Sequence, residues 1–395
     1  MIDIITEAKQ PNEEKLTHLE HAEDHPINAG AAGFAHAKKT LMAGHNALTG
    51  KASNASVTTK YDGSPSIVFG HHPETGKFFV ASKSAFNKNP KINYTPEDIQ
   101  TNHGHAPGLV SKLSAALKHL PKVTPKEGVF QGDIMHSGAK SKSNPEGDVT
   151  MHGGEAHFTP NTITYSTKKP GEADQVAGSK IGVAVHTSYH GKDFASMKAK
   201  YNSGNEGFGT HKDVHLMDVS HPIEKSKYPA EAQSKFKEHM AAAEDAHKEL
   251  EATGGYHELE KHTDHLKTYI NKTVRTGETP STEGYTHHVA EHYSKAAAKV
   301  KTPAAKSKAE NAGNELVAHA RENEDSFENL LHVHHHLQAA KNVLATAFSS
   351  HTDYGHSVGD QKVKPEGHVL AINNRPTKIV DRAEFSRNNF NKNRN

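Results

Sequence analysis

The chain has 395 residues, of which 33% are hydrophobic and 24% charged, and it contains no cysteine and no tryptophan. Lysine and arginine (47) nearly balance aspartate and glutamate (46), so the net charge of +1 excludes a global field that attracts nucleic acid or membranes, and a polyanion must bind at a local patch. No apolar run approaches the roughly 20 residues of a membrane span, and the absence of cysteine excludes disulfides and thiolate nucleophiles. We therefore expect a cytoplasmic protein with no membrane partner.

The N-terminal part of the chain has a helical pattern. Phe34, Ala37, Leu41 and Ala47 recur at roughly helical spacing, and Gly50 follows as a stop signal. This predicts a helix within residues 12–49, and residues 1–56 form an N-terminal helical segment.

Short β-like runs begin after this segment. We expect strands over residues 57–60, 66–69, 77–82, 128–135, 157–159, 162–166 and 181–186. Helices are expected from Thr95-Pro96, where an N-cap residue precedes proline and acids, and over residues 109–120. The pattern predicts an α+β fold of mostly antiparallel sheets for residues 57–200.

A long region rich in Ala, Glu, Lys and His follows. Its periodicity predicts helices over residues 230–252, 257–274, 287–300 and 304–348, the last broken near Gly313 or Asn323. Residues 201–359 are therefore expected to be an all-α insertion. Strands at 368–372 and 377–380 return the chain to the first domain, which 360–385 completes, and 386–395 form a tail.

The segment with the most chemical content is Lys60-Tyr61-Asp62-Gly63. A lysine at the end of a strand is held rigidly, and glycine lets the backbone turn beside a bound phosphate. The amine of such a lysine becomes a nucleophile only when its surroundings remove its proton. The alternative interpretation is a solvated lysine in a surface turn.

Four further segments follow in order: Phe130-Gln131-Gly132-Asp133, the apolar run 181–186, Glu366-Gly367 before an apolar strand, and Lys378 in the next strand. This series resembles the ordered motifs of the covalent nucleotidyltransferase superfamily, which contains ATP-dependent DNA and RNA ligases and GTP-dependent capping enzymes. The resemblance spans residues 57–382 and is interrupted by the helical region.

The resemblance implies an antiparallel-sheet adenylation-type domain with Lys60 as the catalytic nucleophile. It implies ATP as the donor, with GTP as second choice, and Mg²⁺ held by Asp133 and Glu366, because pyrophosphate charge must be neutralised during transfer. The nucleotide-binding residues that it implies are Thr59, Asp62, Gly63, Ser66, Lys83, Phe130, Val185, Lys378 and Arg382.

The chain also departs from this pattern. Val380 stands where ligases usually have a second lysine, and the residues after Lys378 are too few for the oligonucleotide-binding barrel of DNA ligases and capping enzymes. This favours an RNA-ligase-like enzyme acting on RNA ends, and general resemblance suggests an uncharacterised protein of a tailed bacteriophage.

Two other functions stay open. One is a nucleotidyltransferase that modifies a protein or a small molecule, and the other is an inactive phage structural or host-interaction protein that keeps the fold. His332 and His336 share a helix face as a pair of zinc ligands would, but no HExxH motif is present, and chance clustering among 34 histidines is the better account. The sequence leaves the oligomeric state open.

Overall fold

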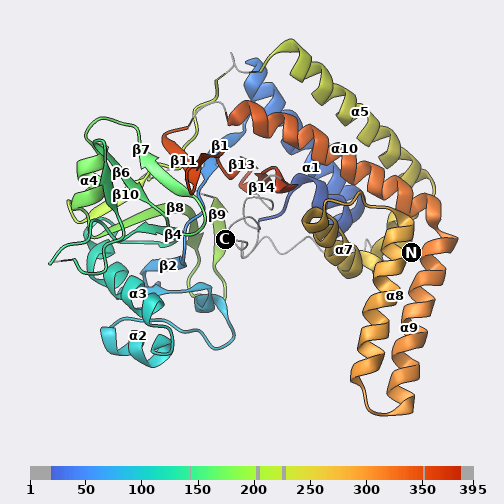
Figure 1. Cartoon of the computed structure of the whole chain (residues 1–395), viewed down its shortest axis with the longest axis horizontal. Helices are drawn as coiled ribbons and strands as arrows, with labels where there is room; N and C mark the ends of the chain where they lie inside the picture. The colour runs from blue at the N-terminus through green and yellow to red at the C-terminus, as the bar shows by residue number, and fades with distance from the viewer. Residues whose placement is uncertain (1–18, 143, 202–204, 225–227, 350–351, 384–395) are drawn as a thin grey trace, which may run out of the picture. The chain divides into compact units, whose positions relative to one another are not determined.

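The structure is a computed structural model that describes residues 19–142, 144–201, 205–224, 228–349 and 352–383 (Figure 1). The described chain divides into two compact units. The first contains Ser56–Ile223 and Ser349–Pro376, and the second contains Glu20–Ala55, Glu224–Phe348 and the described residues from Thr377 on.

The first unit has an α+β fold built on a six-stranded sheet. Its path is β10-β8-β4-β2-β3, and β9 pairs with β8 beside β10. Strand β10 is parallel to β8, whereas the pairs β2–β3, β2–β4, β4–β8 and β8–β9 are antiparallel. The strands of this sheet are β2 (Ser66–His71), β3 (Phe78–Ala81), β4 (Val129–His136), β8 (Ile181–His190), β9 (Lys198–Tyr201) and β10 (Val214–Met217).

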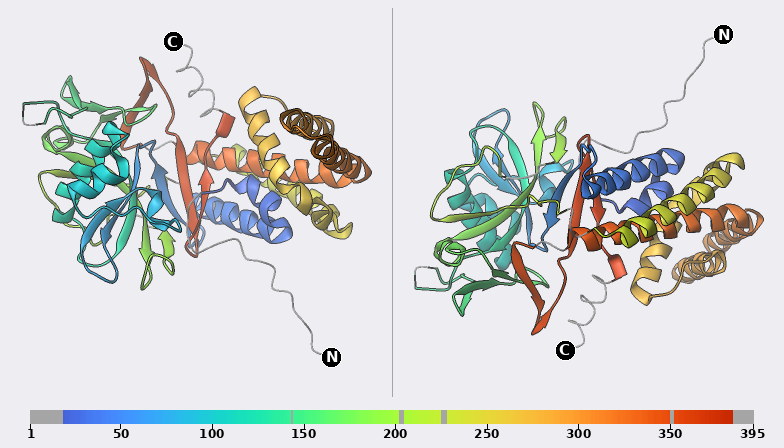
Figure 2. Two further views of the ribbon diagram at one scale, coloured as in Figure 1. Left: turned by 90° about the horizontal axis from the view of Figure 1, so that it is seen from below. Right: turned by 90° about the horizontal axis from the view of Figure 1, so that it is seen from above.

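The two faces of this sheet have different covers. Helices α2 (Pro96–His103) and α3 (Pro107–His119) lie against one face and bury an apolar core there (Figures 1 and 2). The opposite face carries a smaller apolar cluster that includes the short helix η2 (Lys83–Phe86). Alternation along each strand therefore decides which layer a side chain enters.

Two further sheets follow, and the last strand of one of them, β14 (Arg375–Ile379), passes the unit boundary after Pro376, so its last three residues belong to the second unit. A five-stranded sheet has the order β12-β11-β7-β6-β5, and a three-stranded sheet has the order β1-β13-β14. The turn between β13 and β14 consists of Asn373 and Asn374, both with positive φ, as a two-residue hairpin requires. The strands are β1 (Ser56–Lys60), β5 (Thr150–His152), β6 (Glu155–Phe158), β7 (Thr164–Thr167), β11 (Tyr354–Val358), β12 (Gln361–Lys362), β13 (Gly367–Ile372) and β14 (Arg375–Ile379).

The second unit is helical. Helices α5 and α10 run side by side, α8 and α9 form a helical hairpin, and α1 packs against α5 and α10 (Figure 1). Helix α1 is kinked where Ala29 and Gly30 leave helical geometry, and Gly30 has a positive φ that glycine adopts readily. The elements are η1 (Ala22–Asp24), α1 (His25–Thr49), α5 (Ala230–Ala252), α6 (Gly255–Leu259), η5 (Glu260–His262), α7 (Thr263–Thr276), α8 (Thr282–Lys299), α9 (Pro303–Glu322) and α10 (Glu324–Phe348).

The expected class of mixed α+β structure with antiparallel sheets is confirmed. The capping box at Thr95 and Asp98 starts α2 as expected, and the last long helical pattern breaks at Asn323. The structure adds elements that no sequence pattern indicated: η3 (Leu120–Lys122), α4 (Glu172–Gly178), β5 and β9 to β12. The expected tail 386–395 lies outside the described residues, as do residues 12–18 of the expected first helix.

The two compact units group the chain differently from the expected ranges. Residues 20–55, expected as a separate N-terminal segment, belong with the helices of the second unit, and the first unit extends to Ile223. Among the described helices, none has both the length and the apolarity needed to cross a membrane.

Candidate active site

The central contact of the site joins Lys60 and Glu366. Strands β1 and β13 pair antiparallel, and Lys60 is the partner of Gly367, the residue after Glu366. The Lys60 Nζ donates to Glu366 Oε1 at 2.5 Å, although the two residues are 306 positions apart. The lysine side chain is 26% exposed and the glutamate side chain 6%, so the pair is largely shielded from solvent.

The charge on Lys60 is set by opposing effects. Burial alone lowers the pKa of its ammonium, but the carboxylates of Glu366, Asp133 and Asp62 outweigh this effect and raise the pKa above its ordinary value. Lys60 is therefore a cation paired with Glu366, and the two aspartates are near enough to act on its charge. Such an arrangement can attract phosphate groups only if other cations or hydrogen-bond donors neutralise part of the carboxylate charge.

Asp133 lies on β4, on the sheet face opposite the α2–α3 layer. His186 Nε2 approaches its carboxylate at 3.8 Å. Burial raises the pKa of Asp133, but His186, Lys60 and Ser66 together lower it below its usual value. Ser66 also accepts a hydrogen bond from Gln131 Nε2 at 3.1 Å, so polar groups of β2, β4 and β8 meet on this face.

His186 is a site residue that the sequence analysis missed. The β4–β8 register shifts between Gln131 and Gly132, whose partners are Thr187 and Val185, so His186 is an extra residue at a β-bulge. A signal for it was present, because Ile181, Val183 and Val185 alternate with Gly182, Ala184 and His186. The second set must face away from the apolar layer.

Asp62 has a different environment from the one expected of a nucleotide ligand. Its carboxylate accepts from Asn161 Nδ2 at 2.9 Å and from the Thr162 backbone N–H at 3.0 Å. Its own backbone N–H donates to the Tyr165 hydroxyl at 2.6 Å. Asp62 thus fastens the segment after Lys60 to the turn between β6 and β7.

Gly63 is required by close packing. A Cβ at this position would lie 2.5 Å from the Asp133 Cβ and 2.7 Å from the Met135 sulfur, and neither distance is sterically possible. The glycine therefore lets the Lys60 segment approach the strand that carries Asp133. Ser64 strengthens this approach, since its N–H donates to the Ile134 carbonyl at 3.0 Å and its carbonyl accepts from Lys112 Nζ at 2.7 Å.

Two expected nucleotide-binding residues lie on the other face of the sheet. Phe130 and Val185 are buried in the core beneath α3, and Phe130 packs its ring against Phe69 and Phe208. The strands that the resemblance indicated also carry Asp133 and His186. Alternation along those strands then turns these two side chains away from Asp133.

Thr59 lies on β1 and Lys83 on η2, both in the first unit. Thr59 Oγ1 is 3.4 Å from His221 Nδ1, and Thr59 pairs with His368 across β1 and β13. Lys83 is exposed at the first residue of η2.

Lys378 and Arg382 belong to the second unit. The Lys378 N–H donates to the Glu20 carbonyl at 2.8 Å, and Arg382 donates to Asp24 at 2.8 Å and to Asn271 at 2.7 Å. The candidate site around Lys60 and Glu366 therefore consists of first-unit residues.

Two carboxylates of the site have the chemistry that a magnesium ion prefers. Asp133 and Glu366 offer carboxylate oxygens, which this hard cation prefers, and both lie close enough to Lys60 to raise its pKa. Among the described residues, no group of three His, Cys, Asp or Glu side chains is arranged to hold a metal ion. A magnesium ion here would take its remaining ligands from phosphates and water.

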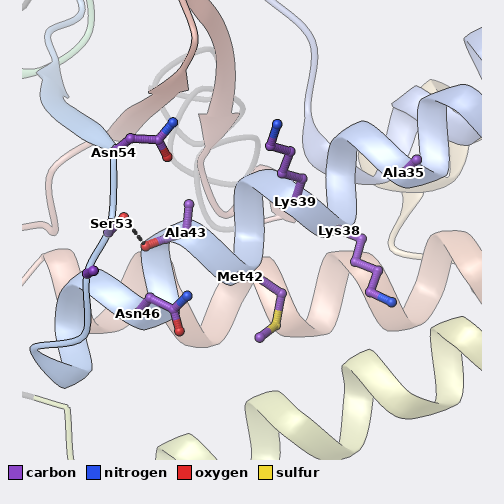
Figure 3. A pocket seen from close by; sticks show the side chains of 9 residues that line it. Ala35, Lys38, Lys39, Met42, Ala43, Asn46, Ser53 and Asn54 are labelled. Carbon is purple, nitrogen blue, oxygen red and sulfur yellow. Dashed lines mark hydrogen bonds between the residues drawn. The ribbon is translucent and has the colours of Figure 1, made fainter.

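The second unit has a separate open groove of about 720 Å³ (Figure 3). It runs along α1 beside the segment after it, where Ser53 donates to the Ala43 carbonyl at 2.8 Å. Lys38 at its edge pairs with Glu244 at 3.0 Å. The groove is lined by Ala35, Lys38, Lys39, Met42, Ala43, Asn46, Ala52, Ser53 and Asn54.

The fold and site thus define an α+β protein with a lysine and carboxylate cluster where its sheets meet. The chain belongs to a family described as "Family of unknown function (DUF6267)", whose model matches residues 12–394. No curated protein and no solved structure matches the chain.

Proposed function

We propose that the first unit is a covalent nucleotidyltransferase in which Lys60 takes up the nucleoside monophosphate of ATP. The observation that supports this most is the contact between Lys60 and Glu366, because it unites the two most widely separated first-unit motifs of the resemblance. The neighbouring Asp133 adds the second carboxylate that this chemistry needs. The adenylation-type fold implied by the resemblance is part of the same proposal.

In the first step, the neutral amine of Lys60 attacks the α-phosphorus of ATP. The N–P bond forms while the bond from that phosphorus to the pyrophosphate oxygen breaks, and pyrophosphate leaves with the electron pair. The proton of Lys60 passes to the Glu366 carboxylate, its hydrogen-bond partner at 2.5 Å, and then to water. A magnesium ion held by Asp133 and Glu366 would supply charge neutralisation for the pyrophosphate.

In the second step, the nucleotide moves from Lys60 to an acceptor. An RNA 5′-phosphate attacks the lysine-bound phosphorus, the N–P bond breaks, and the amine regains a proton. The RNA end is proposed from the ligase resemblance, and a protein or small-molecule acceptor shares only the first step.

The test of the first step is self-labelling. The purified full-length protein is incubated with magnesium and ATP labelled at the α-phosphorus, and denaturing electrophoresis follows. We expect a label that survives denaturation, requires the metal, and is released by acid because a phosphoramidate hydrolyses there. A parallel reaction with GTP measures the nucleotide preference.

Three variants assign the label to a residue. Lys60→Ala and Lys60→Arg should abolish labelling, since arginine keeps the charge but does not lose its proton. Lys126→Ala, which removes an exposed lysine of the same unit, should label like the parent protein. Labelling that persists in Lys60→Arg would place the bond elsewhere and reject the proposal.

A second candidate function is nucleotide binding without transfer. The observation that favours it is the raised pKa of Lys60, because burial, which lowers that pKa, is outweighed by carboxylates that keep the amine protonated. This candidate predicts saturable ATP binding with no covalent label. Such an outcome would make the protein an inactive relative that retains the fold.

A further inference from the structure

A basic segment leaves the sheet next to the candidate active site. From Lys77 to Pro96, both included, the sequence has four lysines and no aspartate or glutamate, in a chain whose net charge is only +1. Within this stretch we define residues 83–91 as the basic segment, and its lysines Lys83, Lys88 and Lys91 are all exposed. It is therefore a local positive patch of the kind that a polyanion requires.

Aromatic packing fixes this segment to the sheet face of the site. The Phe86 ring lies 4.5 Å from the Tyr189 ring, centroid to centroid. The Tyr189 hydroxyl donates to Gln131 Oε1 at 2.5 Å, and Gln131 Nε2 donates to Ser66 Oγ at 3.1 Å. Ser66 is the register partner of Asp133, so direct contacts connect the basic segment with the site.

The strand register also shows how the basic segment is connected to the strand that carries Asp133. Val68 pairs with Ala81 on β3 and with Gln131 on β4, and Ser66 pairs with Asp133. Ala81 is the last residue of β3, and the chain enters η2 two residues further on, at Lys83. The basic segment thus begins two strands away from Asp133, on the face that bears the site.

We propose that the basic segment binds the phosphate backbone of the nucleic-acid strand whose 5′ end accepts the nucleotide. This inference rests on the proposed function for the acceptor's role. Lysines spread along the segment match an anion that repeats along a chain better than a single triphosphate. Lys88 and Lys91 follow Phe86 along the segment and are exposed, and Lys91 Nζ donates to the Asn102 carbonyl of α2 at 3.5 Å.

Equilibrium binding tests this surface without requiring catalysis. The probe is a fluorescently labelled, 5′-phosphorylated single strand of RNA, and anisotropy is followed over a series of salt concentrations with the full-length protein. The variant is Lys88→Gln with Lys91→Gln. The matched control is Lys140→Gln with Lys142→Gln, which removes two other exposed lysines of the same unit and changes the net charge equally.

We expect the Lys88/Lys91 variant to bind about tenfold more weakly. The slope of log affinity against log salt should become shallower by about 1.4, because each of the two lost phosphate contacts contributes about 0.7 to it. The control should bind like the parent protein. Self-labelling of Lys60 should stay unchanged in both variants, because neither change alters a residue of the nucleotide site.

Other outcomes overturn the inference. Equal weakening in the control would show a general charge effect, and competition by polyglutamate as strong as by unlabelled RNA would show a surface for acidic proteins. A protein that labels itself but does not bind RNA refutes the inference and keeps the proposed function. A protein that binds RNA through Lys88 and Lys91 but never labels refutes the proposed function and keeps the surface.

Discussion

Lys60 and Glu366 meet at 2.5 Å because β1 and β13 pair with Lys60 opposite Gly367. The chain leaves the first unit at Ile223 and returns at Ser349 before it supplies this partner. A glutamate that is 6% exposed and already bound to the proposed nucleophile is well placed to receive its proton. The pair therefore makes Glu366 the most informative residue to change after Lys60.

The Glu366→Gln variant should lose self-labelling by about a hundredfold, the range typical of a lost proton acceptor. The amide keeps the shape of the side chain but neither accepts the proton nor binds magnesium well. Initial rates of labelling at saturating ATP measure the effect, and Glu127→Gln, an exposed glutamate before β4, is the control. Unchanged or faster labelling would show that Glu366 only restrains Lys60.

Asp62 is predicted to act on stability more than on nucleotide binding. Asp62→Ala removes the acceptor for Asn161 and for the Thr162 N–H, and should destabilise the first unit by about 2–4 kcal/mol because hydrogen bonds to a charged group are lost. Asp62→Asn should cost less, since one oxygen remains. Denaturant unfolding followed by circular dichroism measures both, with exposed Asp174→Ala as control. A fully stable Asp62→Ala protein that fails to label would assign Asp62 to the nucleotide instead.

The sequence indicates the helical unit far better than the site. The expected helix over 230–252 coincides with α5. Of the two positions at which a break was expected, Asn323 ends α9, whereas Gly313 lies inside it. These features depend on local periodicity. Strands such as β9, with four residues, and β12, with two, are too short to show a hydrophobic period. Pairing with neighbouring strands determines whether they form.

The site contains one feature that local sequence patterns do not predict and one that they do. No spacing rule predicts that residues 60 and 366 touch, and only the ordered resemblance suggested it. The expected residues Val185 and Phe130 were wrong for this face, although local alternation alone places His186 on the polar face and Phe130 in the core. The alternation along each strand therefore shows which of its side chains face the core.

Acid should weaken the helical unit through His262. This side chain is fully buried, and its ring nitrogens lie 2.8 Å from the Tyr285 hydroxyl and 3.0 Å from His319 Nδ1. Burial lowers the pKa of His262 to about 4, with smaller contributions from His319, Lys261 and His265, compared with 6.5 for an ordinary histidine.

Because the folded state keeps His262 neutral, the unfolded chain binds the extra proton. The stabilisation is complete above about pH 6.5 and falls as the pH drops towards 4, by at most about 3 kcal/mol. His262→Phe should therefore reduce the loss of unfolding free energy between neutral and acid pH. His257→Phe, at a side chain that is 84% exposed, should not. Identical pH slopes for His262→Phe and the parent protein would contradict this account.

The last prediction concerns a buried ion pair in the helical unit. Lys341 Nζ donates to Glu23 Oε1 at 2.6 Å, and both side chains are fully buried. Burial raises the pKa of Glu23, but Lys341 outweighs it and the pKa is lowered, so the carboxylate is ionised. Arg382 lies 3.7 Å from the same oxygen, which adds a second positive group.

Removing one partner should cost much more than removing both. Lys341→Met leaves a buried carboxylate without its closest cation and should lower the free energy of unfolding by about 3–5 kcal/mol. Adding Glu23→Gln to it should recover most of this loss, because no charge of the pair then remains buried. Urea unfolding of the full chain, followed by far-ultraviolet circular dichroism of the helices, measures all three proteins. Lys235→Met breaks an exposed pair with Glu231 and should leave the free energy of unfolding nearly unchanged. A double variant as unstable as Lys341→Met would show that the packing of the lysine side chain, rather than its charge, stabilises this part of the unit.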